Sequence, residues 1–286
     1  MKVRLVDLDE ERPGVYASYI VDTGGPVAVV DVGPAKTVDR LAEELEGKGP
    51  IHVFITHVHL DHAGGLGHLV ERVQVERVYV HPRGAPHLVD PARLWAASVE
   101  VLGSTALEYG KPKPVPGRLV YTPKPGEEIR LGDATFKVVP AEGHASHQYA
   151  YLAGDVLFPG DGLGEVYGDS VLILTPPPFM AGEAIAALDR FQRLGASYAA
   201  LPHFGIHEDP RRLSRRYKAK LLWALSLAER YADQAELAER LLEDAETREA
   251  LEELRQRRGH WEGYLERCAA GLLGYVERFG WATGVK

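Results

Sequence analysis

The sequence predicts an α/β protein that ends in a helical region, and two observations support this. Up to about residue 205, short runs of β-branched and aromatic residues alternate with segments whose apolar residues recur at helical spacing. From about Ile206, glycine becomes scarce and helix-forming residues dominate. A chain of 286 residues is long enough for one large domain, or for one domain with an appendage.

The first third of the chain is predicted to contain strands, followed by helices between further strands. Residues 3–32 alternate as in an antiparallel sheet, with a turn at residues 22–26. Val38, Leu41 and Leu45 then form the apolar stripe of an amphipathic helix. Further strands are expected at residues 51–55 and 77–80, and further helices at residues 66–73 and 94–107.

The middle of the chain returns to strands after a proline-rich segment. Residues 108–126 are predicted to be an insertion, because their prolines suit an extended loop better than a helix or a central strand. The elements expected after it are strands at residues 129–131, 135–139, 149–152, 156–158, 171–174 and 198–201, with a helix at residues 182–194 before the last strand.

The C-terminal region, residues 206–286, is predicted to be a helical extension of a catalytic domain formed by residues 1–205. Helices are expected at residues 213–231 and 237–254. A third helix is indicated by an apolar stripe that runs from Trp261 to Phe279 at spacings of three, four and seven residues. No strand is expected here.

Composition limits the partners and the compartment. The formal net charge of −8 argues against general binding to nucleic acid or to an anionic membrane surface. Cys268 is the only cysteine, so a reducing cytoplasm is expected, with neither an intramolecular disulfide nor a cysteine metal cluster. The charged N-terminus has no apolar stretch typical of a signal peptide, and no later run is long enough to span a bilayer.

The stretch THVHLDHAGG, residues 56–65, concentrates metal-binding side chains between a predicted buried strand and a predicted helix. In a loop, residues two apart can point the same way, so His57 and His59 can bind one ion while Asp61 and His62 face a second position. Imidazole nitrogens with a carboxylate suit zinc, and also iron or manganese. The alternative, a solvated histidine-rich loop, leaves the glycines and the apolar strand unexplained.

This stretch resembles the HxHxDH signature of the metallo-β-lactamase superfamily. The resemblance covers residues 1 to about 205 and implies a four-layer αββα sandwich, in which two mixed sheets face each other beneath outer helices. Periodicity alone does not choose this architecture over other α/β layouts. A match so short also requires further ligands at the ends of later strands.

The first distant ligand is expected in the sequence EGHASH, residues 142–147. This segment resembles the Gly-His motif of the superfamily, which implies that His144 is the ligand. His147 is expected to support the site by hydrogen bonding rather than to bind metal, because ligands are normally oriented by such outer partners.

Asp155 and Asp161 compete for the role of bridging carboxylate. Gly154-Asp155 is ordinary hairpin chemistry, whereas the sequence around Asp161, LFPGDGLG, follows a complete strand and resembles the Gly-Asp motif of the superfamily. Asp161 is therefore preferred. His203, at the end of the last strand, resembles the closing histidine, although Phe204 stands where glycine is frequent.

The resemblance implies a binuclear centre. It assigns His57, His59 and His144 to one metal, Asp61, His62 and His203 to the other, and Asp161 to both. Asp31 matches an early Asp-x-Gly motif of the superfamily and is expected either to hydrogen-bond beneath the site or simply to form a turn. For the remaining residues of interest we expect packing or solvent exposure: His52, His68, His81, His87, His207, His260 and Cys268.

The function implied is hydrolysis by a metal-bound hydroxide, with two divalent ions that are expected to be zinc, or else iron or manganese. Asp61 would also orient the nucleophile and move its proton. The Gly-Asp-Gly sequence at residues 160–162 resembles the glyoxalase II-like branch, which implies a thioester, ester or lactone substrate.

Two other enzyme classes remain as alternatives. A metal pair can also bind a phosphoryl group, so a phosphodiesterase or nuclease is possible. A basic run could then bind an anionic substrate, although a solvated helix face is favoured for it; its residues are Arg211, Arg212, Arg215, Arg216, Lys218 and Lys220. The third class is an iron-dependent dioxygenase.

Partners are expected to be few. A small acyl substrate is predicted, with neither nucleic acid nor membrane, and a homodimer is favoured. The loop at residues 162–170 is expected to border the pocket, so that Tyr167 reaches the substrate; this rests on position alone.

Overall fold

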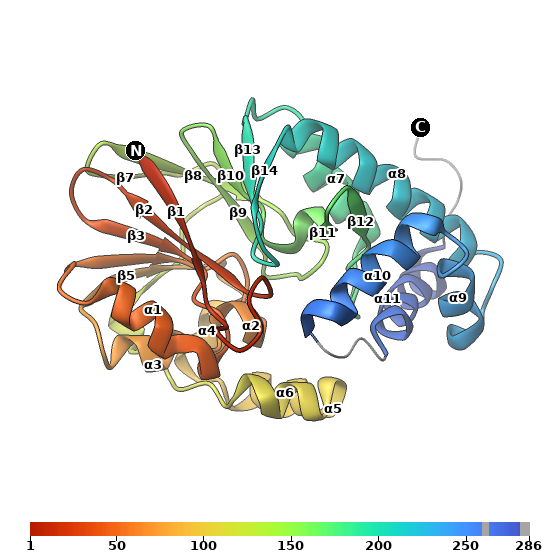
Figure 1. Ribbon diagram of the computed structural model, residues 1–286, viewed down its shortest axis with the longest axis horizontal. Coiled ribbons are helices and arrows are strands. Elements are labelled where there is room, and N and C mark those ends of the chain that lie inside the picture. Colours follow the sequence, from red (N-terminus) through yellow and green to blue (C-terminus); the bar gives the residue numbers. More distant parts are fainter. Residues whose placement is uncertain (259–262, 281–286) are drawn as a thin grey trace. The chain divides into compact units, whose positions relative to one another are not determined.

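The computed structural model describes residues 1–258 and 263–280, which group into two compact units (Figure 1). We call these unit 1 and unit 2. Unit 1 comprises Met1–Pro140, His147–Gly160 and Ala196–Glu208, and unit 2 comprises Ala141–Ser146, Asp161–Gly195 and Asp209–Lys286. The chain therefore passes repeatedly between the two units.

The first sheet of unit 1 has its strands in chain order, and the first part is antiparallel as expected. Its strands are β1 (Lys2–Asp7), β2 (Ala17–Asp22), β3 (Val27–Val30), β4 (Ile51–Phe54), β5 (Val75–Tyr79) and β6 (Val120–Tyr121). The pairs from β3 to β6 are parallel. Parallel pairing brings the ends of β3, β4 and β5 to one edge, where loops can carry ligands.

Helices cover one face of this sheet. They are α1 (Val38–Leu45), α2 (Leu60–Ala63), α3 (Leu66–Val70), α4 (Ala85–Val89), α5 (Ala92–Leu102) and α6 (Ser104–Tyr109). The predicted stripe of α1 is confirmed, since Val38, Leu41 and Leu45 are buried in one cluster with the sheet residues Val29 and Val53. In Figure 1, α1 and α3 lie along this side of the sheet.

The second sheet of unit 1 is formed by the later strands. They are β7 (Glu128–Leu131), β8 (Ala134–Pro140), β9 (Tyr149–Ala153), β10 (Val156–Phe158), β13 (Tyr198–Ala200) and β14 (Ile206–Glu208), in the order β14-β13-β10-β9-β8-β7. Only β10 and β13 pair in parallel among these neighbours. The prediction of no strand after residue 205 was wrong, because β14 pairs with β13.

The two sheets share an aromatic core. The ring of Phe54 on β4 stacks on the rings of Phe136 on β8 and Tyr79 on β5, with distances between ring centres of 4.2 Å and 4.5 Å. The hydroxyl of Tyr151 donates to the carbonyls of Ile55 and Tyr79, which ties β9 to the ends of β4 and β5. This packing is that of the predicted sandwich, and the mixed α/β fold is confirmed.

The proline-rich segment was only partly predicted. Within it, a short 3₁₀ turn, η2 (Gly117–Leu119), leads directly into β6. Another 3₁₀ turn, η1 (Ala35–Thr37), lies outside this segment and precedes α1. The prediction of a purely extended loop was therefore wrong for Val120 and Tyr121, which pair with β5 at the edge of the sheet. The strand is limited to two residues because the 3₁₀ turn η2 ends directly before it and Pro123, which cannot donate a ladder hydrogen bond, lies two residues after it.

Unit 2 contains a small hairpin and the later helices. Its elements are η3 (Gly160–Leu163, which starts at the last residue of unit 1), β11 (Glu165–Tyr167), β12 (Ser170–Leu172), α7 (Ala181–Phe191), α8 (Pro210–Ala228), α9 (Gln234–Leu241), α10 (Ala245–Arg258) and α11 (Tyr264–Phe279). The predicted loop at residues 162–170 thus contains β11, which pairs with β12. Contacts of α11 with α8 and α9, and of α10 with β12, hold the unit together.

The C-terminal helices are present as predicted, with one correction. The single helix expected at residues 237–254 is two helices, because Asp244 caps a new one: its carboxylate accepts from the backbone N–H and the hydroxyl of Thr247, both at 2.8 Å. Trp261, the start of the predicted stripe, lies outside the described residues.

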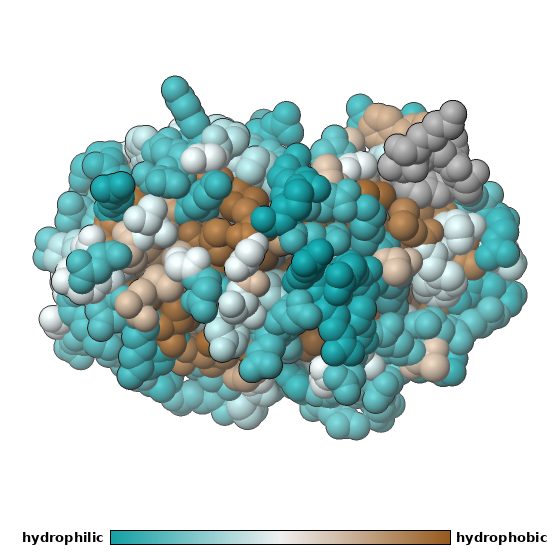
Figure 2. Space-filling view, turned by 90° about the horizontal axis from the view of Figure 1, so that it is seen from above, coloured by the Kyte–Doolittle hydropathy of each residue, from teal (hydrophilic) through white to brown (hydrophobic). Residues whose placement is uncertain are grey.

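Within residues 1–258 and 263–280, no helix combines the length and apolar character needed to cross a bilayer. Figure 2 shows hydrophilic side chains over much of one face, with apolar side chains between them.

Candidate metal centre

The histidine loop lies where strand β4 gives way to helix α2, as the sequence predicts. All four residues of β4 are buried, and α2 begins at Leu60 with Asp61 in its first turn. Residues 56 and 57 directly continue from the sheet edge, so the loop starts from a rigid element. His57 and His62 are both fully buried.

Unit 1 gathers five of the predicted ligands in two neighbouring groups. Nε2 of His57 lies 3.0 Å from Nδ1 of His59. Oδ2 of Asp61 lies 3.9 Å from Nε2 of His62 and 3.7 Å from Nε2 of His203. One ligand atom from each of Asp61, His62 and His203 lies within 4.8 Å of the other two, which is close enough to share one ion.

Asp31 lies beneath this loop and binds it in three places. Its carboxylate accepts from the backbone N–H of Thr56 at 2.8 Å and from the hydroxyl of Thr56 at 2.7 Å. Oδ2 also lies 3.2 Å from Nδ1 of His62, so a proton on Nδ1 leaves Nε2 as the lone-pair nitrogen that faces Asp61. Asp31 has a φ of 52°, a strained value for a residue other than glycine.

His147 lies beside the same loop. Its Nδ1 accepts from the backbone N–H of Val58 at 3.4 Å, and its ring centre is 5.5 Å from that of His59. The ring of His87, on α4, is 6.4 Å from that of His147. This ring contact agrees with the expectation that His87 packs against its neighbours rather than binding metal.

Unit 2 carries the other two predicted ligands, and they face each other. Nε2 of His144 lies 3.3 Å from Oδ2 of Asp161, and the two residues are 5% and 2% exposed. Nδ1 of His144 lies 3.1 Å from the carbonyl of Leu174, which selects the Nδ1–H form and leaves Nε2 available as a ligand. Asp155, the rejected alternative, is exposed in the turn between β9 and β10.

The other histidines that the structure describes have structural partners. Burial lowers the pKa of His52, whose Nδ1 lies 3.2 Å from the hydroxyl of Tyr79. His68 reaches the carbonyl of Lys111, His81 accepts from the N–H of Arg83, and His207 reaches the carbonyl of Phe204. His260 lies outside the described residues. Cys268 is buried, and burial raises its pKa to about 11, so its thiol is neutral at pH 7.

Two expectations about unit 2 were incomplete. Tyr167 was expected to reach a substrate, but it is only 3% exposed, its hydroxyl donates to Glu165, and Arg257 lies over its ring. The basic run on α8 was expected to be a solvated face. Lys220 is instead buried against Asp244 at 3.0 Å, while Arg216 pairs with Glu246 and Lys218 with Asp189.

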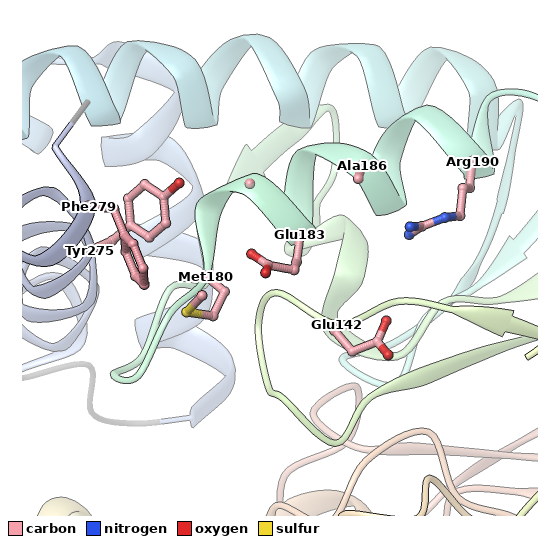
Figure 3. A pocket seen from close by; sticks show the side chains of 8 residues that line it. Glu142, Met180, Glu183, Ala186, Arg190, Tyr275 and Phe279 are labelled. Carbon is pink, nitrogen blue, oxygen red and sulfur yellow. The ribbon is translucent and has the colours of Figure 1, made fainter. Parts of the chain in front are cut away.

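Unit 2 also contains an open pocket of about 390 Å³ (Figure 3). Its lining residues are Glu142, Met180, Gly182, Glu183, Ala186, Arg190, Tyr275 and Phe279. The ring centres of Tyr275 and Phe279 are 5.1 Å apart. The charged lining residues come from α7 and from the segment that precedes His144. None of the predicted ligands lines this pocket.

Comparison with known proteins identifies the family. The sequence profile described as the metallo-beta-lactamase superfamily matches residues 12–203, which include every predicted ligand. The chain belongs to the metallo-β-lactamase superfamily. Members of this superfamily that resemble it include hydrolases, and the chain is an enzyme of this metal-dependent family.

Curated relatives support the glyoxalase II-like resemblance. A metallo-beta-lactamase fold-containing protein from Sulfurisphaera tokodaii is 25% identical over 202 residues, covering 68% of this chain and 75% of that protein. A hydroxyacylglutathione hydrolase from Xanthomonas axonopodis pv. citri is 28% identical over 203 residues, covering 68% of this chain and 66% of that protein. Neither match covers the whole of this chain.

A solved structure extends the likeness of fold. A metallo-beta-lactamase family protein from Thermus thermophilus superposes with a TM-score of 0.70 at 21% identity, covering 97% of this chain and 94% of that chain. The C-terminal helices are therefore part of a fold that this chain shares with another superfamily member.

Proposed function

We propose that this enzyme is a dinuclear metal-dependent hydrolase of a small thioester, ester or lactone. The observation that carries the proposal is the presence of two ligand groups, Asp61 with His62 and His203 in unit 1, and His144 with Asp161 in unit 2. In the proposed centre His57, His59 and His144 would hold one metal, Asp61, His62 and His203 would hold the other, and Asp161 would supply a carboxylate to both.

The residues fit divalent metal ions. Imidazole nitrogens and carboxylate oxygens are donors that bind zinc, and iron and manganese accept the same set. His62 and His144 each have Nδ1 at a hydrogen-bond acceptor, so Nε2 of both is available to a metal. Zinc is proposed first. Bound ions would polarise the substrate carbonyl and lower the pKa of water.

Asp61 is the proposed proton acceptor. Its side chain is 17% exposed, whereas those of His62 and His203 are 0% and 4% exposed, so Asp61 is the group in its cluster that water and substrate reach most easily. A carboxylate held between two imidazoles can orient a water molecule and take its proton.

The substrate class rests on the relatives. The hydroxyacylglutathione hydrolases among its curated relatives have names that state a reaction, and they favour an acyl substrate. In the basic run of α8, Arg216, Lys218 and Lys220 already pair with acidic groups of unit 2. This pairing reduces the positive charge that the run could offer to a phosphodiester, although Arg211, Arg212 and Arg215 are exposed. A small molecule is therefore the proposed partner, without nucleic acid or membrane.

The proposal is tested with purified protein loaded with zinc, iron or manganese in parallel. Acyl-thioesters, aryl esters and lactones form one panel, and bis-p-nitrophenyl phosphate and a persulfide form two further assays. We expect turnover on at least one acyl substrate, and Asp61→Ala should abolish it. Cleavage of the phosphodiester alone would show a phosphodiesterase, and oxygen uptake with the persulfide alone would show a dioxygenase.

A cytoplasmic location and a homodimer remain proposals. The location rests on the single cysteine, which is buried and uncharged. Sedimentation of the zinc-loaded protein would decide the oligomeric state.

A further inference from the structure

In unit 2, the segment Ile173–Thr175 is hydrogen-bonded both to His144 and to the C-terminal helices. The carbonyl of Leu174 lies 3.1 Å from Nδ1 of His144. The backbone N–H of the same residue donates to the hydroxyl of Tyr217, on α8, at 3.2 Å. A single residue thus connects a proposed ligand to a helix that lies more than forty positions later in the chain.

Helix α11 holds the same segment. The hydroxyl of Tyr264 donates to the carbonyl of Ile173 at 3.0 Å, and the thiol of Cys268 lies 3.4 Å from that carbonyl. The hydroxyl of Thr175 donates to the carbonyl of Cys268 at 2.9 Å. The peptide between Ile173 and Leu174 is therefore bonded at its carbonyl by α11 and at its N–H by α8.

Tyr217 also contacts the turn that carries Asp161. Gly164 donates its N–H to the carbonyl of Asp161 at 3.1 Å, which closes this turn. Gly164 has a φ of +68°, and a Cβ added to it would lie 2.5 Å from the ring of Tyr217 and also against the carbonyl of Leu172. The ring therefore packs directly against the turn, and Tyr217 itself is 2% exposed.

We propose that Tyr217 is a positioning residue for the metal centre, which acts through Leu174 on His144 and through Gly164 on Asp161. This rests on the proposed function to the extent that His144 and Asp161 bind metal. The physical reason is that a metal-binding histidine needs its other nitrogen held by a fixed acceptor. The acceptor here is a carbonyl in a segment that lies past the end of β12, so Tyr217 limits its movement.

The first test is Tyr217→Phe, which removes the hydroxyl but keeps the ring against Gly164. Zinc affinity is measured by calorimetric titration of metal-free protein, and the ring tautomer of His144 by long-range ¹H–¹⁵N spectra. We expect the zinc affinity to fall about tenfold, in the range found when an outer partner of a ligand is lost. His144 should change from one Nδ1–H form to a mixture. Unchanged affinity and tautomer would overturn the proposal.

Tyr264→Phe is the matched control. It also removes a buried tyrosine hydroxyl from this segment, but the carbonyl of Ile173 keeps the thiol of Cys268 as a partner. We expect zinc affinity within about threefold of the unaltered protein. An equal loss in both variants would mean that general loosening of the helices is responsible, and would refute a specific role for Tyr217.

A measurement on the unaltered protein covers the case in which Tyr217→Phe does not fold. Coupling between sites is reciprocal, so zinc binding must slow hydrogen exchange at the amide of Leu174 if that amide positions a ligand. Equal exchange with and without zinc would contradict the proposal. These readouts do not involve turnover, so a protein that binds zinc but hydrolyses no acyl substrate would refute the proposed function alone.

Discussion

The two ligand groups are built in different ways. In unit 1, His57, His59, Asp61 and His62 come from six consecutive residues, and the strand before them and the helix after them fix the loop. In unit 2, two separate segments supply His144 and Asp161. Their geometry depends on Leu174 and on helix α8, which lie far away in the chain.

The two ligand groups should therefore be sensitive to substitutions in different parts of the chain. The unit 1 group depends on local structure with one long-range support, Asp31, which lies twenty-five residues before Thr56. The unit 2 group depends on packing between distant segments, so changes that touch neither ligand should still disturb it.

Asp61→Ala should have the largest effect, because it removes a proposed ligand and proton acceptor from the local group. We expect turnover to fall by more than the ~100-fold that loss of a supporting partner costs. The assay is hydrolysis of the best acyl substrate, with zinc content measured on the same sample. A variant that keeps a tenth of the activity would remove Asp61 from the mechanism.

Gly143→Ala tests the dependence of the unit 2 group on packing. Gly143 has a φ of +143°, and an added Cβ would lie 2.5 Å from Cα of Ala184 on α7. The clash should displace the adjacent His144 and lower the free energy of unfolding by ~1–3 kcal/mol. Zinc titration should show at least about tenfold weaker binding.

Gly195→Ala is the control for Gly143→Ala. Its φ is +74°, but an added Cβ meets nothing within 4 Å. It should cost about 1 kcal/mol of stability through backbone strain alone and leave zinc affinity unchanged. If both variants weaken zinc binding equally, the packing against α7 is irrelevant to His144.

Asp31→Asn should weaken zinc binding by the unit 1 group, but with a smaller effect than Asp61→Ala. Asparagine tolerates the positive φ of this position, so the backbone is kept. In the asparagine variant, an NH₂ donor takes the place of one of the carboxylate oxygens that face Thr56 and His62. Because one of these hydrogen bonds is lost, zinc affinity should fall about 10- to 100-fold. Asp155→Asn, in an exposed turn, should change nothing. Equal affinities for both variants would make Asp31 a turn former only.

Lys220→Met should change stability but not metal binding. Burial opposes the charge on Asp244, but hydrogen bonds from Lys220 and Thr247 outweigh it and hold the pKa of Asp244 below its ordinary value of 3.8. A lowered carboxyl pKa contributes stability above the unfolded pKa, and this is lost as pH falls through the folded pKa. Lys220→Met should therefore cost ~1–3 kcal/mol at pH 7.

The stability difference between Lys220→Met and the unaltered protein should shrink as the pH falls below 3.8 toward the lowered pKa at which folded Asp244 becomes protonated. Urea unfolding at a series of pH values measures it. A difference that stays constant down to pH 2 would show that packing of the Lys220 side chain, rather than its charge, is responsible.

Much of the fold followed from periodicity, because long strands and amphipathic helices leave regular apolar patterns. The elements that were missed are short. Strands β6, β11 and β14 have two or three residues, and a neighbouring strand rather than their own pattern decides their pairing. The break between α9 and α10 came from Asp244, a cap that the continuous helical spacing concealed.

The candidate site was predictable to a different extent in each unit. The density of ligands in residues 56–65 indicated a metal site by itself, whereas His144 and Asp161 required the family resemblance. Tyr217 was not predictable, since it occupies an ordinary buried position of a helix. Periodicity shows that such a residue is buried, but not which backbone N–H its hydroxyl meets.

The interleaving of the two units has a consequence for how this protein can change during evolution. Residues 209–286 group with residues 161–195, so the helices at the end of the chain share a compact unit with the segments that hold His144 and Asp161. If the last helices were replaced by those of another protein, the hydrogen bond between Tyr217 and Leu174, which supports the acceptor of His144, would also have to be replaced. The two parts are expected to be inherited together.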